Sequence, residues 1–205
     1  DVGVSRASLS GSDTGVFVGV WASEYAEVLA STSSGKSVYA ATATACSVVV
    51  GRMSFALGLM GPCISYDTAC SSGLVACHAA MRALQHYECT TALAAGVNMI
   101  FSPSASATMG LAGMTSPTGK SYSFDVRADG YVRGEACCPA AMKRSGVDQS
   151  DAPHVLANAV RQDGRSASLT APNGMAQQML LSAALDDAAL VPAALSLNEA
   201  HGTGT

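Results

Sequence analysis

The sequence has few charged residues and few aromatic ones. Of its 205 residues only 13% are charged and 5% are aromatic, whereas 49% are hydrophobic. The net charge is −4, and Lys and Arg nowhere form a block. This argues against a surface that binds nucleic acid or an anionic membrane. It also argues against disorder, because so apolar a chain can bury a sizeable core.

The sequence also contains no apolar run that we interpret as a membrane-spanning segment. A span needs about 20 mostly apolar residues in a row. The longest stretch without a charge, residues 89–119, is interrupted by Asn98, Pro103, Pro117 and several Ser and Gly residues. We therefore expect no membrane span.

The seven cysteines show no paired spacing. An odd number without pairs favours a reducing, intracellular compartment (cytoplasm or plastid) over a disulfide scaffold. Cys46, Cys63 and Cys89 have no ligand-like spacing to a histidine, and the adjacent Cys137 and Cys138 would point to opposite faces of a strand, so we predict no metal site. The chain begins without Met and stops inside a Gly/Thr-rich turn, and we interpret it as a piece of a longer protein.

Apolar runs of strand length alternate with helical segments along the chain. Strands are predicted for residues 14–20, 63–67, 91–98, 155–160 and 195–200 and within residues 131–143, and helices for residues 23–30, 45–59, 71–86, 102–114 and 175–189. This alternation predicts an α/β fold with a mostly parallel sheet. The helix at residues 71–86 carries no charge in its first half, so we expect it to be buried on all sides.

The segment that most clearly carries chemistry surrounds Cys70. A predicted buried strand leads into Asp67, Thr68 and Ala69, turns at Cys70 and opens directly into the apolar helix. This arrangement is typical of a nucleophile elbow. The free backbone N–H groups and the dipole at a helix N-terminus stabilise a thiolate, and they can hold an oxyanion on a thioester carbonyl. We therefore predict that Cys70 is a covalent nucleophile rather than a packing thiol.

A second candidate, His201, follows an apolar run near the end of the sequence. It opens the turn Gly202, Thr203, Gly204, Thr205. The glycines permit close backbone approach, and the two hydroxyls can bond a polar ligand arm. The carboxyl end of a strand is where α/β proteins place catalytic groups. The pattern alone leaves open the alternative of a solvent-facing loop histidine.

Four motifs occur in order along nearly the whole chain. They are DTACSS at residues 67–72, FDVRADGYVRGE at residues 124–135, QDGRSASLTAPNG at residues 162–174 and EAHGTGT at residues 199–205. Together they resemble the ketosynthase (β-ketoacyl synthase) domain of type I polyketide synthases, within the thiolase-like superfamily.

The resemblance implies a thiolase-like αβαβα layered fold, built from two related halves, that works as a homodimer. Residues 1–150 would form most of the first half, with Cys70, and residues 151–205 would begin the second half, with His201. The family's later Lys-Ser-Asn…Gly-His motif, which supplies a second catalytic histidine, and its Gly-rich loop would lie beyond Thr205. Residues 1–205 alone are therefore expected to be inactive and poorly folded.

The resemblance also implies the reaction of a β-ketoacyl-[acyl-carrier-protein] synthase of polyketide or fatty acid biosynthesis. Cys70 would accept an acyl group from the phosphopantetheine of an acyl carrier protein, and its backbone N–H would help form the oxyanion hole. His201 would stabilise the enolate left when a malonyl extender loses carbon dioxide, before a Claisen condensation. Thr203 and Thr205 match positions whose hydroxyls hold the pantetheine arm. The domain itself would bind no cofactor.

Two other functions are weighed against this one. A non-catalytic ketosynthase-like partner subunit would typically lack the nucleophile, which is present as Cys70. A Cys–His thioester or amide hydrolase needs water at the acyl-enzyme, and the apolar residues around the Cys70 helix would exclude it.

Departures from the family pattern occur at Ala43, Met60, Ala136, Pro139 and Arg161. They leave substrate preference and local strand geometry open.

Overall fold

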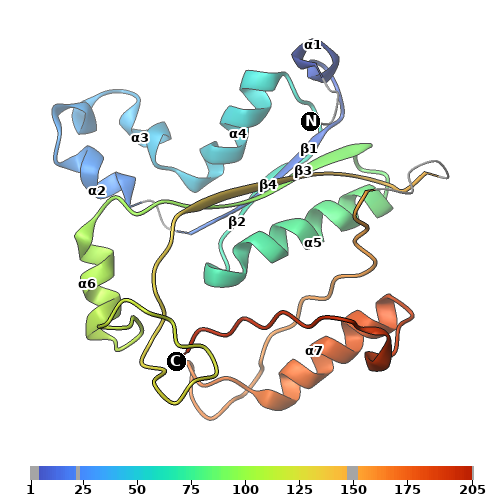
Figure 1. Ribbon diagram of the computed structural model, residues 1–205. Coiled ribbons are helices and arrows are strands. Elements are labelled where there is room, and N and C mark those ends of the chain that lie inside the picture. The colour runs from blue at the N-terminus through green and yellow to red at the C-terminus, as the bar shows by residue number, and fades with distance from the viewer. Residues whose placement is uncertain (1–4, 22–23, 147–151, 205) are drawn as a thin grey trace. The chain divides into compact units, whose positions relative to one another are not determined.

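The computed structural model describes residues 5–21, 24–146 and 152–204 (Figure 1). The chain forms two compact units. The first comprises Asp1–Arg144 with His201–Thr205, and the second comprises Ser145–Ala200. The first unit holds a β-sheet, and the second holds the helix α7 (Gly174–Asp187) and the short 3-10 helix η3 (Pro192–Ala194).

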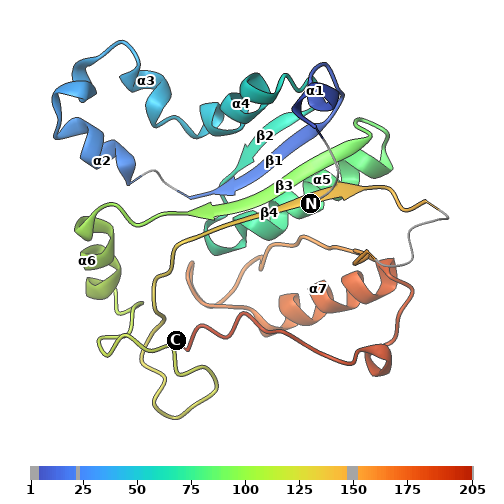
Figure 2. The ribbon, with the colours of Figure 1, turned by 45° about the horizontal axis from the view of Figure 1, so that its top comes forward.

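A four-stranded sheet forms the centre of the first unit, in the order β2-β1-β3-β4 (Figure 2). The strands are β1 (Gly15–Val20), β2 (Cys63–Tyr66), β3 (Thr91–Asn98) and β4 (Ala136–Lys143). Strand β1 pairs in parallel with both β2 and β3, so that Val16 lies between Cys63 and Leu93. The predicted α/β fold with a mostly parallel sheet is confirmed.

Strand β4 runs antiparallel to β3. It lies within residues 131–143, where the pattern predicts a strand, and it begins at Ala136 after a loop. Pro139 is accommodated opposite Ala95. Proline has no backbone N–H to donate to a neighbouring strand. It fits here because β4 is the edge strand in the sheet order and has a neighbour on one side only.

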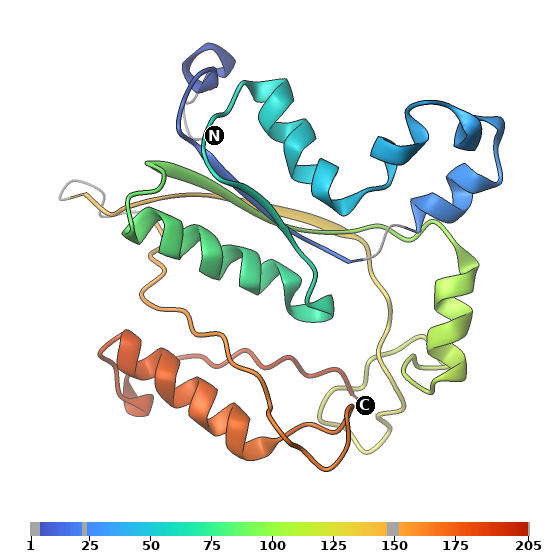
Figure 3. The same cartoon turned by 180° about the vertical axis from the view of Figure 1, so that it is seen from behind.

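The helical segments of the first unit are α1 (Arg6–Leu9), α2 (Tyr25–Ala30), η1 (Ser33–Lys36), α3 (Ala40–Ala43), α4 (Cys46–Leu57), η2 (Ala69–Ser71), α5 (Ser72–Gln85) and α6 (Pro103–Leu111). Two of them, α4 and α5, pack on the sheet. Helix α4 lies on one face and α5 on the other (Figures 1 and 3). Helix α4 ends at Gly58, whose φ of 71° is left-handed and which suits glycine at this position. In the part of the chain that the structure describes, no helix is long and apolar enough to cross a membrane.

Two buried clusters flank the sheet because alternate residues of each strand face opposite sides. On the α5 side the cluster contains Phe17, Ala76, Ala80, Ala83, Leu84, Cys89, Ala92 and Ala94. On the α4 side it contains Val16, Val18, Val50, Leu59 and Ala95. Each fully buried valine or phenylalanine contributes about 1.5–3 kcal/mol of hydrophobic stabilisation. Strand β1 is thus apolar at every position for the reason that the pattern suggested, namely burial on two faces.

Two predicted strands are wrong. Residues 155–160 and 195–200 are described as irregular backbone, and Val155, Leu156 and Leu197 are exposed. A run of strand-forming residues becomes a strand only when a neighbouring strand accepts its hydrogen bonds. The described residues of this unit contain no such neighbour.

The prediction that the helix after Cys70 is buried on all sides is also wrong. In α5 the side of Ala76, Ala80 and Leu84 packs on the sheet, but Leu74 is 70% exposed. An apolar helix surface can be buried, but it is buried only where another element of the protein packs against it. Helix α5 therefore has one buried face, and Leu74 lies on its exposed side.

The first turn of α5 packs directly on two strands because glycine occupies the contact points. A Cβ atom on Gly19 of β1 would lie 2.3 Å from the carbonyl carbon of Ser72 and 2.5 Å from the Gly73 nitrogen. A Cβ atom on Gly96 of β3 would lie 3.5 Å from the Gly73 Cα. These approaches fix the start of α5 at the carboxyl end of β1.

Replacing Gly19 by alanine should destabilise the protein by about 1–3 kcal/mol, because the new methyl group meets backbone that no side-chain rotation can move. The matched control is Gly51→Ala on α4, where a Cβ meets nothing within 4 Å. There alanine should stabilise by about 0.5–1 kcal/mol. Urea unfolding of both variants of the complete ketosynthase measures the difference, and equal effects would contradict this packing.

Candidate active site

The parallel strands deliver their following segments to one edge of the sheet. Strands β1, β2 and β3 all end there, at Val20, Tyr66 and Asn98, and the antiparallel β4 begins there at Ala136. In open α/β sheets ligands bind outside the carboxyl ends of the parallel strands. This edge is therefore where a site is expected.

Cys70 lies at this edge, in the short turn η2 between β2 and α5. Its side chain is exposed. The residue before it, Ala69, has a φ of 56°, a left-handed conformation that residues with a Cβ rarely adopt. Strained residues of this kind cluster at functional sites. The structure places Cys70 where the sequence predicts, at the junction of strand and helix, while its catalytic role stays a prediction.

Short hydrogen bonds hold this turn in its strained shape. The Ser72 Oγ accepts from the Thr68 N–H at 2.8 Å and donates to the Ala69 carbonyl at 2.7 Å. An Asp67 carboxylate oxygen accepts from the Ala69 N–H at 3.1 Å. Ser72 is 4% exposed, so water cannot easily replace these bonds. Hydrogen bonds from residues before and after Cys70 in the sequence thus hold the turn.

Two other cysteines lie in the interior and behave as packing residues. Burial raises the pKa of the Cys77 thiol. Burial also raises the pKa of the Cys89 thiol, an effect only partly offset by a hydrogen bond with the Gly15 backbone. Both side chains belong to the apolar cluster on the α5 side of the sheet. They stay neutral thiols at neutral pH.

His201 lies on a segment held by a loop rather than at the end of a strand. The Gly130 N–H donates to the Gly204 carbonyl at 3.0 Å, and the Ser123 hydroxyl donates to the Gly202 carbonyl. Figure 3 shows this C-terminal segment beside the loop. His201 itself is exposed. The expectation that it follows a strand is wrong, because residues 195–200 form none.

The other predicted site residues lie on the same segment. Thr203 is half-buried between two glycines that have left-handed φ values, 51° at Gly202 and 73° at Gly204. Thr205 lies outside the described residues. The structure places Cys70 and His201 on separate segments, and their pairing stays a prediction. Among residues 5–21, 24–146 and 152–204, no three His, Cys, Asp or Glu side chains cluster closely enough to hold a metal ion.

The sequence analysis missed a buried ion pair at this edge, between Glu24 and Arg133. Their side chains are only 6% and 10% exposed. The Glu24 carboxylate also accepts from the N–H groups of Phe101 and Ser102, both at 2.9 Å, and Arg133 also donates to the Ser106 hydroxyl at 2.7 Å. One feature of the sequence could have indicated this pair: Arg133 lies within the motif at residues 124–135, in a chain that has few charged residues.

The environment of Glu24 favours its charged form. Burial raises the pKa of this carboxyl, but hydrogen bonds from the Ser102 N–H, Arg133 and the Phe101 N–H lower the pKa by more, so that it lies below its ordinary value. Glu24 is therefore ionised at neutral pH, and it neutralises the buried Arg133.

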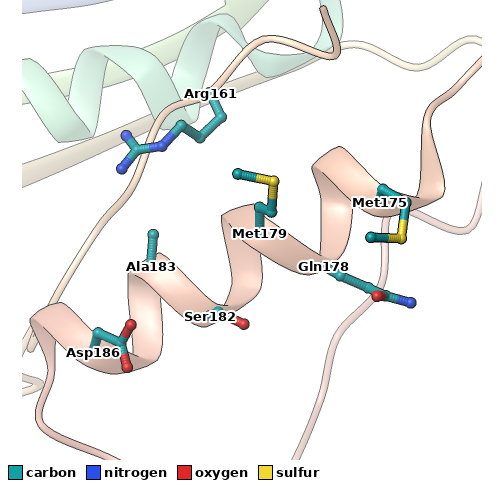
Figure 4. Close-up of a pocket in the computed structure, with 7 residues that line it drawn as sticks. All are labelled: Arg161, Met175, Gln178, Met179, Ser182, Ala183 and Asp186. Atoms are coloured by element: carbon teal, nitrogen blue, oxygen red, sulfur yellow. The ribbon is translucent and has the colours of Figure 1, made fainter.

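The second unit has a shallow pocket along α7 (Figure 4). It is lined by Arg161, Met175, Gln178, Met179, Ser182, Ala183 and Asp186. Met179 and Ala183 point toward the Arg161 side chain. The pocket contains none of the predicted site residues.

Comparison with protein families gives a match along almost the whole chain. The model of the β-ketoacyl synthase N-terminal domain matches residues 1–146, and that of the β-ketoacyl synthase C-terminal domain matches residues 152–205. The chain belongs to the β-ketoacyl synthase family.

Curated relatives of this ketosynthase segment are polyketide synthases. It is 41% identical to a mycocerosic acid synthase-like polyketide synthase of Mycolicibacterium smegmatis, with 99% of the chain aligned to 10% of that protein. It is 42% identical to a phenolphthiocerol/phthiocerol polyketide synthase of Mycobacterium tuberculosis, with 99% aligned to 11%. The chain thus spans about a tenth of the length of these relatives.

Solved structures of ketosynthases share the fold. The ketosynthase from module 6 of the bacillaene synthase of Bacillus subtilis 168 is 32% identical, with a TM-score of 0.87, over 100% of this chain and 36% of that one. An oxazolomycin ketosynthase domain of Streptomyces albus JA3453 is 37% identical, with a TM-score of 0.87, over 100% of this chain and 37% of that one. The thiolase-like fold and the resemblance to type I polyketide ketosynthases are confirmed.

Removing the hydroxyl that closes the Cys70 turn should loosen it. Ser72→Ala leaves the Thr68 N–H without its partner and should cost about 1–3 kcal/mol. Ser71→Ala, which removes an exposed hydroxyl of the same turn, should cost less than about 0.5 kcal/mol. Urea unfolding of the complete ketosynthase measures both losses. The rate of Cys70 alkylation by iodoacetamide, followed by mass spectrometry, should change only with Ser72→Ala. Equal losses in the two variants would count against the turn described here.

The lowered pKa of Glu24 makes stability depend on pH in a defined direction. A carboxyl whose folded pKa lies below its unfolded value of about 4.3 stabilises the fold above that value, and this contribution is lost as the pH falls through the folded pKa. The unsubstituted protein should therefore lose more unfolding free energy between about pH 5 and pH 3 than Glu24→Gln does. Urea titrations of the complete ketosynthase across this pH range test the difference, and parallel pH curves for the two proteins would refute it.

Proposed function

We propose that this chain is the nucleophile-bearing part of a polyketide ketosynthase, which joins an acyl group to a malonyl-type extender. The observation that carries the proposal is the position of Cys70, exposed in a strained turn between β2 and the N-terminus of α5. Backbone N–H groups at the start of a helix can stabilise an oxyanion that forms beside them. Membership of the β-ketoacyl synthase family supports the same reaction.

In the first step Cys70 takes up the acyl group. Its thiolate attacks the thioester carbonyl of an acyl chain carried on phosphopantetheine, and a tetrahedral oxyanion forms near the Cys70 backbone N–H. The new C–S bond forms and the old one breaks, so the pantetheine thiolate leaves and takes a proton. The product is an acyl-Cys70 thioester.

In the second step the extender supplies a carbon nucleophile. The bond between the malonyl α-carbon and its carboxylate breaks, carbon dioxide leaves, and the electron pair remains as an enolate on the thioester. His201, with a second histidine from the family's later motif, stabilises the enolate oxygen. The α-carbon then attacks the acyl-Cys70 carbonyl, a C–C bond forms, and the Cys70 thiolate is released.

The proposed partners follow from the substrates. An acyl carrier protein would present both thioesters, and the hydroxyls of Thr203 and Thr205 would hold the pantetheine arm. We also propose a homodimer and a reducing intracellular compartment, the latter supported by seven free thiols. Relatives that are polyketide synthases favour polyketide over fatty acid synthesis.

The two steps can be separated by substitution in the full-length synthase that carries this segment. Cys70→Ala should abolish acyl transfer from an acyl carrier protein, because it removes the proposed nucleophile. His201→Ala should leave acylation of Cys70 largely intact and slow condensation by about a hundred-fold or more, since it removes an enolate stabiliser. Mass spectrometry of the acyl-enzyme and release of labelled carbon dioxide measure the two steps.

His154→Ala is the matched control, since it removes a histidine outside the predicted site and should change neither step. Absence of acylation in the unsubstituted synthase would indicate a non-catalytic partner protein instead. Release of free acid without a condensed product would indicate a thioester hydrolase.

A further inference from the structure

Three segments that leave the sheet at the Cys70 edge converge on one carboxylate. Glu24 follows β1, Phe101 and Ser102 follow β3, and Arg133 precedes β4. The Glu24 carboxylate accepts from the N–H groups of Phe101 and Ser102 at 2.9 Å and pairs with Arg133. One buried side chain thus ties the start of α6 and the approach to β4 to the end of β1.

Arg133 extends this tie along α6. Its second guanidinium nitrogen donates to the Ser106 hydroxyl at 2.7 Å, one turn into the helix. Two residues earlier, the Tyr131 hydroxyl donates to the Met109 sulfur at 3.1 Å, and the Tyr131 backbone bonds to the segment after α6 through Met114 at 3.1 Å. Helix α6 and the chain around Arg133 therefore form one hydrogen-bonded block.

The same block holds the segment of His201. Gly130, three residues before Arg133, donates to the Gly204 carbonyl at 3.0 Å. Gly130 packs closely on the backbone after α6 and has room for no side chain, because its φ is 136° and a Cβ there would lie 2.5 Å from the Ser116 nitrogen. The backbone that carries His201 and Thr203 is thus joined, through Gly130 and Tyr131, to the Glu24–Arg133 pair.

We propose that the Glu24–Arg133 ion pair positions the His201–Gly204 segment, so that the extender step of the reaction depends on it although neither side chain touches substrate. This inference rests on the proposed function of His201. Glu24 and Arg133 are positioning residues. They act through the loop that binds Gly202 and Gly204.

The chemistry of the pair fits positioning better than stability. Burying two charges costs desolvation free energy, and an apolar pair of similar volume often stabilises a fold as well or better. A guanidinium offers several donors in a fixed plane, and here it addresses Glu24 and Ser106 at once. Such a pair fixes direction as well as distance. Displacing a catalytic group by about 1 Å costs as much as 100-fold in rate.

The test compares the two steps in the full-length synthase. Arg133→Ala and Glu24→Gln should each slow condensation by about ten- to a hundred-fold in kcat. The KM for the malonyl carrier protein should change little, and so should the rate of Cys70 acylation, because the Cys70 turn is held by its own hydrogen bonds. Acylation is followed by mass spectrometry, condensation by carbon dioxide release, and folding by the cooperativity of thermal unfolding.

The matched control is Arg127→Gln, which removes an ion pair with Asp125 on the same loop. That pair is solvent-exposed, at 64% and 36% exposed side chains, and exposed pairs contribute little. Both rates should stay unchanged. If Arg133→Ala does not fold, Arg133→Lys decides, because it keeps the charge but cannot bind Glu24 and Ser106 together. It should lower condensation selectively.

A parallel loss of acylation and condensation, or no loss of condensation, would overturn the positioning role. Failure of the unsubstituted synthase to acylate Cys70 is a different result. It would contradict the proposed function, and it is seen before any variant is compared.

Discussion

The structure depends on how closely the first turn of α5 lies on the sheet. Gly19 and Gly96 present bare backbone to Ser72 and Gly73, so the helix start sits against the carboxyl ends of β1 and β3. The chain must then turn from β2 into this helix within a few residues. Ala69 adopts a left-handed conformation to do so, and Cys70 consequently lies at the sheet edge, directly before the start of the helix.

The elements near Cys70 could be predicted from the sequence because the signal there is local. Both faces of β1 are apolar because each packs in a buried cluster. The apolar run before Asp67 and the apolar helical segment after Cys70 predict a strand, a short turn and a helix, as the structure has them. The four motifs likewise suffice to indicate the family. The position of Cys70 at a helix start needed no knowledge of distant contacts.

Other features could not be predicted, since they depend on neighbours distant in sequence. Residues 155–160 and 195–200 have strand-forming side chains, yet the described chain gives them no strand to pair with. Leu74 shows the same limit on a helix, being apolar and yet exposed. The Glu24–Arg133 pair joins residues more than a hundred positions apart, and no local pattern marks such a contact. The strain at Ala69 was hidden because alanine gives no sign of a positive φ.

The central claim is that Cys70 is the acylated residue and that its own backbone N–H faces the developing oxyanion. The most direct measurement is a crystal structure of the complete ketosynthase after reaction with a chloroacetyl-pantetheine analogue. The account predicts a covalent bond to the Cys70 sulfur, with the carbonyl oxygen of the analogue about 2.7–3.1 Å from the Cys70 nitrogen. Attachment to another cysteine, or a carbonyl oxygen directed away from the start of α5, would contradict it.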